Sequence, residues 1–398
     1  MIIWLVVNIR IGRNKNNQRL FTLGKPGAIV DSTMHKSVTT YNIYHTTKEA
    51  WEAMLLAIGQ ATRSIYWEIY IVLDDEVGGR FFDILKAKSV AGIDVKIILD
   101  YWGSFGISHK KIDELKAAGI DIRFFHRKKN PLAGFKDWFM RRTHRKILIV
   151  DERVGFVGGA NVGIYMEHWD DLVVELQGKP VRSLLRSFAK FYISCGGERE
   201  KVRHLFKYKY RVHHDTFDFV YDDIDRKKSN IKQKYLEAIY KARERVILFS
   251  PYYFPDSQFL KALWHARKRG VRIDLLIPFR SDVRFATYAA YAWFSLMTTF
   301  GIRIHLSKKM MHGKGVVVDD DLAFVGTSNL EHMSFKFNQE VNVSVTDKGA
   351  VARVKHILER WIEDANELDE TKWNKRGWWI RLKEKVARKL YAYWFEVK

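Results

Sequence analysis

The sequence contains one cysteine, Cys195, among 398 residues, which excludes an intramolecular disulfide framework and a cysteine-rich zinc site. Six prolines and 25 glycines without a biased tract exclude fibrous and low-complexity proteins. No apolar run approaches the roughly 18–20 residues that a membrane-spanning helix needs. Because 47% of the residues are hydrophobic, the chain can bury a large core, and its length suits two globular domains.

Acidic residues are few relative to basic ones. Lys and Arg number 68 against 46 Asp and Glu, a formal net charge of +22. Such a surplus repels itself unless an anionic partner neutralises it, and that partner could be nucleic acid, an anionic membrane or a phosphate-bearing substrate. Thirteen tryptophans favour an interface, since the indole ring is amphipathic.

The chain follows one plan of helices and strands twice. Gly92 and Gly270 end corresponding helices at an offset of 178 residues, and Gly119 and Gly301 do so at 182, which indicates duplication. Strands that alternate with helices of ten or more residues predict an α/β fold. We predict five segments: an N-terminal basic segment (1–40), a first lobe (41–200), a linker (201–229), a second lobe (230–370) and a basic amphipathic C-terminal segment (371–398).

A four-residue motif occurs once in each half. The two copies have the same internal spacing of two, seven and seventeen residues from the histidine, and all four positions share an offset of 168. The copies are His144, Lys146, Asp151 and Asn161, and His312, Lys314, Asp319 and Asn329.

Residues i and i+2 of a strand point to the same face, so each histidine projects together with its lysine. A glycine-rich turn then brings each asparagine back to the same end. Lysine and asparagine can neutralise and hydrogen-bond a phosphoryl group, while two imidazoles suit a double displacement at one phosphorus. Thr327, where the first half has Gly159, offers another phosphate contact. We group Asp151 and Asp319 with the catalytic motif, although an Asp in such a turn is more typical of a structural support.

The stretches HRKILIVDERVGFVGGAN and HGKGVVVDDDLAFVGTSN resemble the paired motifs of the phospholipase D superfamily. Further stretches resemble its bacterial cardiolipin synthase branch: YIVLDDEVGGRF, LDYWGS, PYYFPD, GTSNLEHMSFKFNQEVNV and KRGWW. The resemblance implies two duplicated α/β/α sandwich lobes with the active site at their interface, and phosphatidyl transfer through a phosphohistidine without metal or other cofactor. It implies His144 as nucleophile and His312 as general acid and base, an assignment that could be inverted.

The family also orients each imidazole with a carboxylate downstream of the motif. Here Glu340 lies 28 residues after His312, and Asp171 lies 27 after His144. The residues after Asp171 read Leu-Val-Val-Glu, where related synthases have a basic or histidine-containing stretch, so Asp170 remains an alternative to Asp171.

Basic and aromatic residues gather in two segments, and a third segment is apolar and aromatic. Residues 127–146 carry eight Lys or Arg against one acid, and residues 371–398 carry nine against two, with four tryptophans. In the latter, Trp379, Leu382, Val386, Leu390 and Tyr393 recur at helical spacing, which is typical of a helix in an anionic interface; the alternative is a terminal helix packed on the domain. Residues 285–300 predict a buried helix, with the further hypothesis that Tyr288, Tyr291, Trp293 and Phe294 line an acyl-chain entrance.

We therefore predict a peripheral enzyme at the cytoplasmic face of the cell membrane, transferring phosphatidyl from one phosphatidylglycerol to another with release of glycerol. The alternatives are a hydrolytic phospholipase D, a phosphatidylserine synthase-like enzyme or a nuclease. A helical aromatic stripe disfavours nucleic acid, whose bases stack on aromatics in a groove. The sequence leaves open the oligomeric state and the choice between phosphatidylglycerol and phosphatidylethanolamine as donor.

Overall fold

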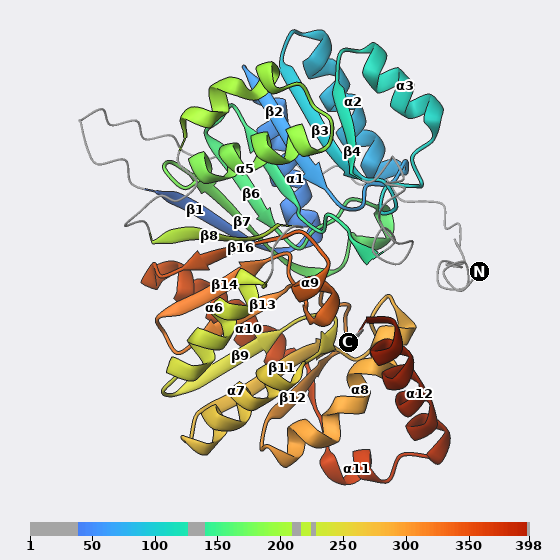
Figure 1. The fold of residues 1–398 in the computed structure, drawn as a ribbon, viewed down its shortest axis with the longest axis vertical. Coiled ribbons are helices and arrows are strands. Elements are labelled where there is room, and N and C mark those ends of the chain that lie inside the picture. Colours follow the sequence, from blue (N-terminus) through green and yellow to red (C-terminus); the bar gives the residue numbers. More distant parts are fainter. Residues whose placement is uncertain (1–38, 126–139, 209–215, 224–227, 396–398) are drawn as a thin grey trace, which may run out of the picture. The chain divides into compact units, whose positions relative to one another are not determined.

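A computed structural model describes residues 39–125, 140–208, 216–223 and 228–395, with side chains up to Tyr391. These described residues form one compact unit, drawn in Figure 1. The basic residues 127–139 and the N-terminal basic segment up to residue 38 lie outside the described residues.

The first half folds into a mixed seven-stranded sheet with the order β1-β7-β6-β5-β2-β3-β4. Strands β2, β3 and β4 are parallel, while β5, β6, β7 and β1 pair in antiparallel fashion. The bounds are β1 (Thr40–Thr46), β2 (Ser64–Ile69), β3 (Asp94–Asp100), β4 (Asp121–Phe125), β5 (Ile147–Val150), β6 (Val154–Gly158) and β7 (Asp170–Gln177).

The second half repeats this topology in an eight-stranded sheet, β17-β12-β11-β9-β13-β14-β16-β8. The strands that correspond between the sheets have the same neighbours in the same order, which confirms the predicted α/β fold with two lobes. The bounds are β8 (Phe217–Asp222), β9 (Arg245–Phe249), β11 (Arg272–Pro278), β12 (Arg303–Ser307), β13 (Gly315–Val318), β14 (Leu322–Gly326), β16 (Glu340–Val345) and β17 (Asn366–Glu367). A separate pair joins β10 (Tyr253–Phe254) to β15 (Leu330–Glu331).

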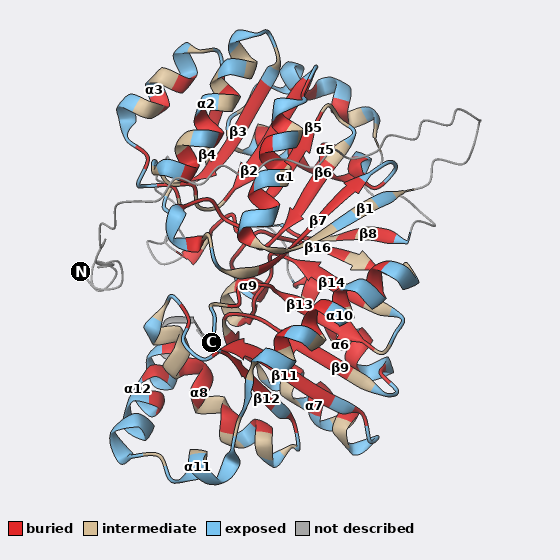
Figure 2. Ribbon diagram, turned by 180° about the vertical axis from the view of Figure 1, so that it is seen from behind, coloured by how far each residue is buried: buried red, intermediate tan, exposed pale blue. Residues whose placement is uncertain are grey.

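Helices cover both faces of each sheet, and the strands between them are buried along most of their length (Figure 2). One core cluster joins α1, α2 and α3 to the first sheet, a second joins α6, α7 and α8 to the second sheet, and a third combines α5 and α10 with strands of both sheets. The α-helix bounds are α1 (Thr47–Gly59), α2 (Glu76–Val90), α3 (His109–Ala117), α5 (Val181–Ser194), α6 (Asn230–Lys241), α7 (Ser257–Lys268), α8 (Arg284–Thr299), α9 (His332–Lys336), α10 (Lys348–Asp364), α11 (Glu370–Asn374) and α12 (Trp378–Phe395). Two 3-10 helices are η2 (Ile164–Met166) and η3 (Arg199–Lys207).

Local sequence signals account for where these helices begin and end. The Thr46 side chain accepts a hydrogen bond from the Glu49 N–H at the start of α1, as the predicted cap requires. Gly92 and Gly270 follow α2 and α7 with φ of +87° and +89°, a left-handed conformation that glycine adopts without steric cost.

Strand β8 lies within residues 201–229, which the sequence predicts as a linker. It pairs with β16 as β1 pairs with β7, so this part of the range belongs to the second sheet. The strand is marked by buried Phe217, Phe219 and Tyr221 in alternation, a period-2 pattern that the surrounding charged residues obscure.

Helices α8 and α12 pack against each other at the end of the second lobe (Figure 1). Phe294 and Tyr291 of α8 lie in the core of that lobe, and Trp373 contacts both rings at 5.2 Å between centroids. The hypothesis that they line an acyl-chain entrance is therefore wrong for these two residues, because their side chains already pack into the core. The predicted helix forms, but it is buried along one face only, at Ala289, Ala290, Tyr291, Phe294 and Met297.

Candidate active site

Both motifs lie at one edge of their sheet, where the parallel strands end. Strand β5 is antiparallel to β2 and starts beside its end, with Ile147 opposite Glu68, so His144 and Lys146 stand at the carboxyl end of β2. Strand β13 stands in the same relation to β9, with Gly315 opposite Phe249. The carboxyl edge of parallel strands is where α/β proteins bind ligands.

Short backbone bridges lock the segment before each histidine onto the other half. Thr143 pairs in parallel with Gln339, and the His144 N–H donates to the Gln339 carbonyl at 2.9 Å. Reciprocally, Met311 pairs with Asp170, and the His312 N–H donates to the Asp170 carbonyl at 2.6 Å. This register sets His144 beside Glu340, the residue after Gln339, and His312 beside Asp171, the residue after Asp170.

The orienting carboxylates are consequently exchanged between the halves. His144 Nδ1 lies 3.0 Å from Glu340 Oε2, and His312 Nδ1 lies 2.7 Å from Asp171 Oδ2. In the sequence, Asp171 follows His144 and Glu340 follows His312 within the same half. In the structure, each histidine instead contacts the carboxylate of the opposite half. It also resolves the alternative between Asp170 and Asp171, since the latter contacts the ring.

Burial and mutual charge set the protonation states of this cluster. Burial lowers the pKa of His144 to about 4 despite Glu340, and burial together with Lys314 lowers the pKa of His312. Burial opposes ionisation of Glu340, but His144 holds its pKa below the ordinary value. Neutral imidazoles therefore donate from Nδ1 to a carboxylate, which directs the Nε2 lone pair away from it.

Two buried lysines complete the cluster. Lys146 donates to the His144 carbonyl at 2.7 Å, and Lys314 donates to the His312 carbonyl. Burial lowers the pKa of Lys146 to about 7, with Lys314 contributing, and burial lowers that of Lys314 to about 8. The charge of Lys314 acts on both Lys146 and His144, so the half-sites lie within electrostatic reach of one another. An anionic phosphate between them would favour the charged form of both lysines.

The asparagines follow the glycine-rich turns at the same edge. Asn161 is buried, and its Oδ1 accepts from the Ile71 N–H at 3.2 Å. Asn329 is equally buried, and its Oδ1 has no hydrogen-bond partner among the described residues. The Asn329 side chain also hydrogen-bonds Glu331, and its Oδ1 is left for a hydrogen-bond donor.

Thr327 does not play the phosphate-binding part that the sequence predicts for it. Its hydroxyl donates to Glu340 Oε2 at 2.6 Å, the same oxygen that contacts His144, and accepts from the Val341 N–H at 3.0 Å. Pairing of β14 with β16 ends at Gly326 and Asn342, and the Thr327 N–H donates to the carbonyl of Val341, the residue after Glu340, so the hydroxyl is within reach of the Glu340 carboxylate. In the first half a Cβ on Gly159 would lie 2.1 Å from Asp171 Oδ1, so the carboxylate occupies the space of the missing side chain.

Asp151 and Asp319, grouped with the catalytic residues, lie instead at the opposite end of their strands. Asp151 accepts from the backbone N–H groups of residues 62–64, and Asp319 accepts from those of residues 243–245. Both have left-handed backbones, with φ of +54° and +52°. A turn after a buried strand has unsatisfied N–H groups nearby, and the carboxylate satisfies them. Grouping Asp151 and Asp319 with the catalytic residues is therefore wrong. Their role as structural supports is confirmed by these hydrogen bonds.

Replacing Asp151 by Ala should lower stability and leave catalysis intact. Loss of the bonds to residues 62–64 should cost about 0.5–1.5 kcal/mol of unfolding free energy, because three backbone donors, two of them on exposed residues, lose their acceptor. Thermal melting and the transfer rate per folded molecule measure the two effects. Asp319→Ala is the matched variant in the second lobe. A large fall in turnover at an unchanged melting temperature would contradict this role.

Two aromatic rings that sequence reasoning missed flank the imidazoles. Tyr70 stands edge-on to His144 at 5.1 Å, with Lys146 over its ring at 5.2 Å, and Trp169 contacts His312 at 5.2 Å. Trp169 directly precedes Asp170 and Asp171, and Tyr70 directly follows β2. Their positions at the ends of strands are the sequence signal by which they could have been predicted. The rings shield the imidazoles from water.

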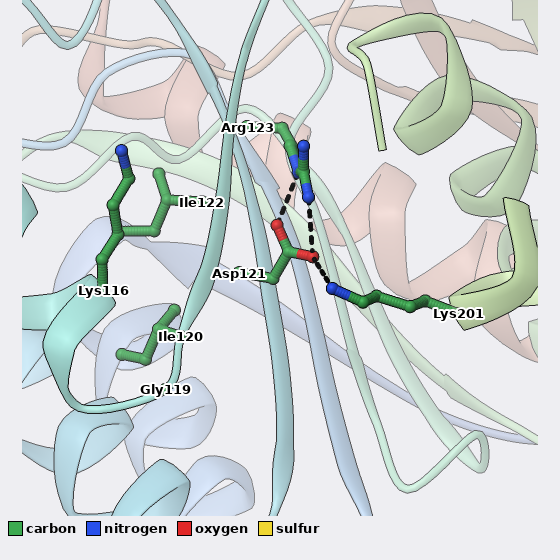
Figure 3. Close-up of a pocket in the computed structure, with 7 residues that line it drawn as sticks. All are labelled: Lys116, Gly119, Ile120, Asp121, Ile122, Arg123 and Lys201. Atoms are coloured by element: carbon green, nitrogen blue, oxygen red, sulfur yellow. Dashed lines mark hydrogen bonds and ion pairs between the residues drawn. The ribbon is translucent and has the colours of Figure 1, made fainter. Parts of the chain in front are cut away.

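A hollow on the first lobe offers a contrast (Figure 3). Its volume is about 380 Å³ and its lining includes Lys116, Arg123 and Lys201 but no histidine. Arg123 and Lys201 both point to Asp121, at 2.5 Å and 3.7 Å, so these charges are already paired. The two-histidine cluster is therefore the stronger candidate for chemistry.

Comparison with known proteins identifies the family of the chain. A family model described as "Cardiolipin synthase, PLD-like domain" matches residues 54–190 and 235–362, once for each lobe. The chain belongs to this family. The two matched ranges contain both histidines, both lysines and both asparagines of the cluster.

Individual relatives of the cardiolipin synthase family align over almost the whole chain. Cardiolipin synthase 2 of Bacillus anthracis is 32% identical over 96% of this chain and 75% of the relative. Cardiolipin synthase B of Escherichia coli is 30% identical over 85% of this chain and 84% of the relative. Among solved structures, a phosphatidylserine synthase of Haemophilus influenzae superposes with a TM-score of 0.70 over 87% of this chain and 93% of that chain. Its 14% identity shows a shared fold alone.

Proposed function

We propose that the protein is a phosphatidyltransferase of the cardiolipin synthase type. In the proposed reaction it takes a phosphatidyl group from one phosphatidylglycerol, releases glycerol and passes the group to a second phosphatidylglycerol. The observation that supports this most is the exchanged pair of contacts, His144 with Glu340 and His312 with Asp171, beside two buried lysines. A phosphodiester is the substrate that needs two imidazoles and two cations together.

In the first step His144 Nε2 attacks phosphorus, and the bond from phosphorus to the glycerol oxygen breaks. His312, protonated, gives its proton to the departing alkoxide. Asp171 stabilises that imidazolium, and Glu340 does the same for His144 as it becomes a phosphohistidine. An anionic phosphate raises the pKa of His312, which offsets the lowering by burial and supplies the required proton.

The second step reverses the first with another alcohol. The acceptor hydroxyl gives its proton to His312 as its oxygen attacks phosphorus, and the bond to His144 breaks. Lys146, Lys314, Asn161 and Asn329 are the groups we assign to the phosphoryl oxygens. Because water would compete with the acceptor and yield phosphatidic acid, exclusion of water is part of the proposed mechanism.

We assign membrane contact to α12. Glu384, Ala387 and Tyr391 face the domain, and the Tyr391 ring stacks on Phe254 at 3.6 Å. The other side exposes five large apolar residues amid basic ones: Trp378, Trp379, Leu382, Val386 and Leu390. Packing on the domain and exposure of an apolar stripe thus coexist in one helix, and the stripe with its basic flanks suits an anionic lipid surface. Within the described ranges, no helix is both long and apolar enough to cross a bilayer.

Changing Trp378 and Trp379 to Ser should weaken vesicle binding. Their side chains are 62% and 60% exposed, so the change removes apolar area from the stripe without opening the core. We expect binding to phosphatidylglycerol vesicles to fall by about tenfold or more, measured by sedimentation. Trp264→Ser, an exposed tryptophan on α7, is the control. Equal binding by the double variant and wild type would refute this assignment.

Products of incubation with labelled phosphatidylglycerol vesicles test the proposed function. Thin-layer analysis should show cardiolipin together with free glycerol. A hydrolase would give phosphatidic acid as the main product. A phosphatidylserine synthase-like enzyme would form phosphatidylserine when serine and an activated lipid are added. A nuclease would cleave single-stranded DNA in a parallel tube. Any of these in place of cardiolipin would refute the proposal.

A further inference from the structure

One carboxylate stands near the cationic site without serving either histidine. Asp282 follows β11 by four residues, at the same strand edge as the second motif, and it is exposed. Its loop is fixed by local bonds: the Ser281 hydroxyl donates to the Val283 carbonyl at 2.8 Å, and the Ser281 N–H donates to Thr287 at 3.0 Å. The carboxylate is thus held in place.

Tyr252, in the loop between β9 and β10, holds Asp282. The Tyr252 hydroxyl donates to Asp282 Oδ1 at 2.7 Å, the one side-chain contact of Asp282 recorded among the described residues. Ser250 anchors Tyr252, since its hydroxyl donates to the Tyr252 carbonyl at 2.6 Å and accepts from the Leu330 N–H at 3.2 Å. Leu330 directly follows Asn329, so the Tyr252–Asp282 pair is built onto the turn that carries a predicted phosphate ligand.

The charge of Asp282 reaches the reacting groups. Burial and Lys314 lower the pKa of His312, while Asp171 and then Asp282 raise it. Asp282 also raises the pKa of Lys314 and that of two tyrosines in the first half, Tyr70 and Tyr165. A carboxylate in this position repels a phosphate anion, so it disfavours the substrate group that the lysines favour. It fits a hydrogen-bond donor on the substrate instead.

We propose that Tyr252 and Asp282 form the subsite for the alcohol, an inference that rests on the proposed function. In this subsite Asp282 accepts a hydrogen bond from a hydroxyl of the alcohol that does not react. In a double displacement the departing glycerol and the incoming alcohol occupy the same side of phosphorus, next to His312. One pair of residues would therefore recognise both. Glycerol has neighbouring hydroxyls, so one can react while another donates to Asp282. The pair acts as a specificity determinant, and the proton still moves to and from His312.

Competition between alcohols tests this subsite. The donor is phosphatidyl-p-nitrophenol in mixed micelles, whose leaving group carries no aliphatic hydroxyl. Equal concentrations of glycerol and 1-propanol compete as acceptors, and lipid products are quantified by mass spectrometry. We expect Asp282→Asn to lower the ratio of glycerol to propanol products by about tenfold or more, because propanol has no second hydroxyl to lose a partner. Tyr252→Phe should lower the same ratio by a smaller factor, since the carboxylate loses its anchor.

Tyr208→Phe is the matched control. It removes a tyrosine–carboxylate hydrogen bond of 2.9 Å to Glu152, beside Asp151 at the opposite end of the strands, and should leave the ratio at the wild-type value. Melting temperatures of all three variants identify any that misfold; if Asp282→Asn does, Tyr252→Phe decides the test.

The outcomes separate the subsite from the reaction itself. An unchanged ratio in folded Asp282→Asn, with transfer intact in the wild type, would overturn the subsite alone. A parallel competition with ethanolamine extends the test: a loss of ethanolamine product that exceeds the loss of glycerol product would overturn it in favour of an ammonium site. Absence of any alcohol product from the wild type would overturn the proposed function and the subsite together.

Discussion

His144→Ala and His312→Ala should each reduce phosphatidyl transfer by about 10⁴-fold or more, the scale of loss when one member of a catalytic unit is removed. The two losses should differ in kind. With phosphatidyl-p-nitrophenol, whose leaving group needs no proton, His312→Ala should release a burst of nitrophenol close to one equivalent and then stall. His144→Ala should release no burst, because it lacks the attacking nitrogen.

A third buried histidine–carboxylate pair, outside the site, provides the control. His305 Nε2 lies 2.8 Å from Asp274 Oδ1 in the second lobe, and the ring is buried. His305→Gln removes a buried imidazole without touching the site, so it should lower the melting temperature and keep the burst and turnover. Transfer retained by either motif variant would contradict the two-imidazole mechanism, and a burst from His144→Ala alone would invert the two roles.

The second large effect concerns the exchanged carboxylates. Glu340→Gln and Asp171→Asn should lower turnover by about 10²–10⁴-fold, because an amide cannot stabilise the imidazolium and can favour the wrong tautomer. The exchange predicts which step each change affects. Glu340→Gln should slow the nitrophenol burst, since Glu340 contacts His144, and Asp171→Asn should slow the turnover that follows, since Asp171 contacts His312.

Glu175→Gln is the control for these changes. Glu175 lies on β7, the strand of Asp171, and its Oε2 accepts from the Tyr44 hydroxyl at 2.6 Å. Loss of that bond should affect stability and leave both kinetic phases alone. The opposite assignment, with the burst slowed by Asp171→Asn, would show that each carboxylate serves the histidine of its own half.

The sequence sufficed for the duplication and for the cluster because both depend on local patterns. Strand and helix periodicity is local, and a spacing repeated at an offset of 168 residues marks the same positions in both lobes. His144, Lys146, His312, Lys314 and the two asparagines could therefore be proposed without coordinates.

The exchange of carboxylates could not be inferred in this way. Asp171 follows His144 by 27 residues and Glu340 follows His312 by 28, so pairing within a half and pairing between halves leave nearly the same trace in the sequence. The bridges Thr143–Gln339 and Met311–Asp170 distinguish the two kinds of pairing. They join segments that are distant in the sequence, so no local pattern predicts them.

Thr327 and Asp282 illustrate a related limit. A hydroxyl in a phosphate-binding turn suggests a phosphate contact, yet the Thr327 hydroxyl donates to the Glu340 carboxylate. Asp282 belongs to no repeated motif, and its relevance arises from the contact with Tyr252, 30 residues away. Residues whose role comes from tertiary neighbours carry no spacing signal.

The stereochemical course at phosphorus is the most direct test of the central claim that two imidazoles act in succession on one phosphorus atom. Transfer from phosphatidylglycerol made chiral at phosphorus with oxygen isotopes, followed by ³¹P NMR of the product, reports whether displacement occurs twice or once. Two in-line displacements through a phosphohistidine predict retention of configuration. Inversion would mean a single direct displacement and would contradict the account.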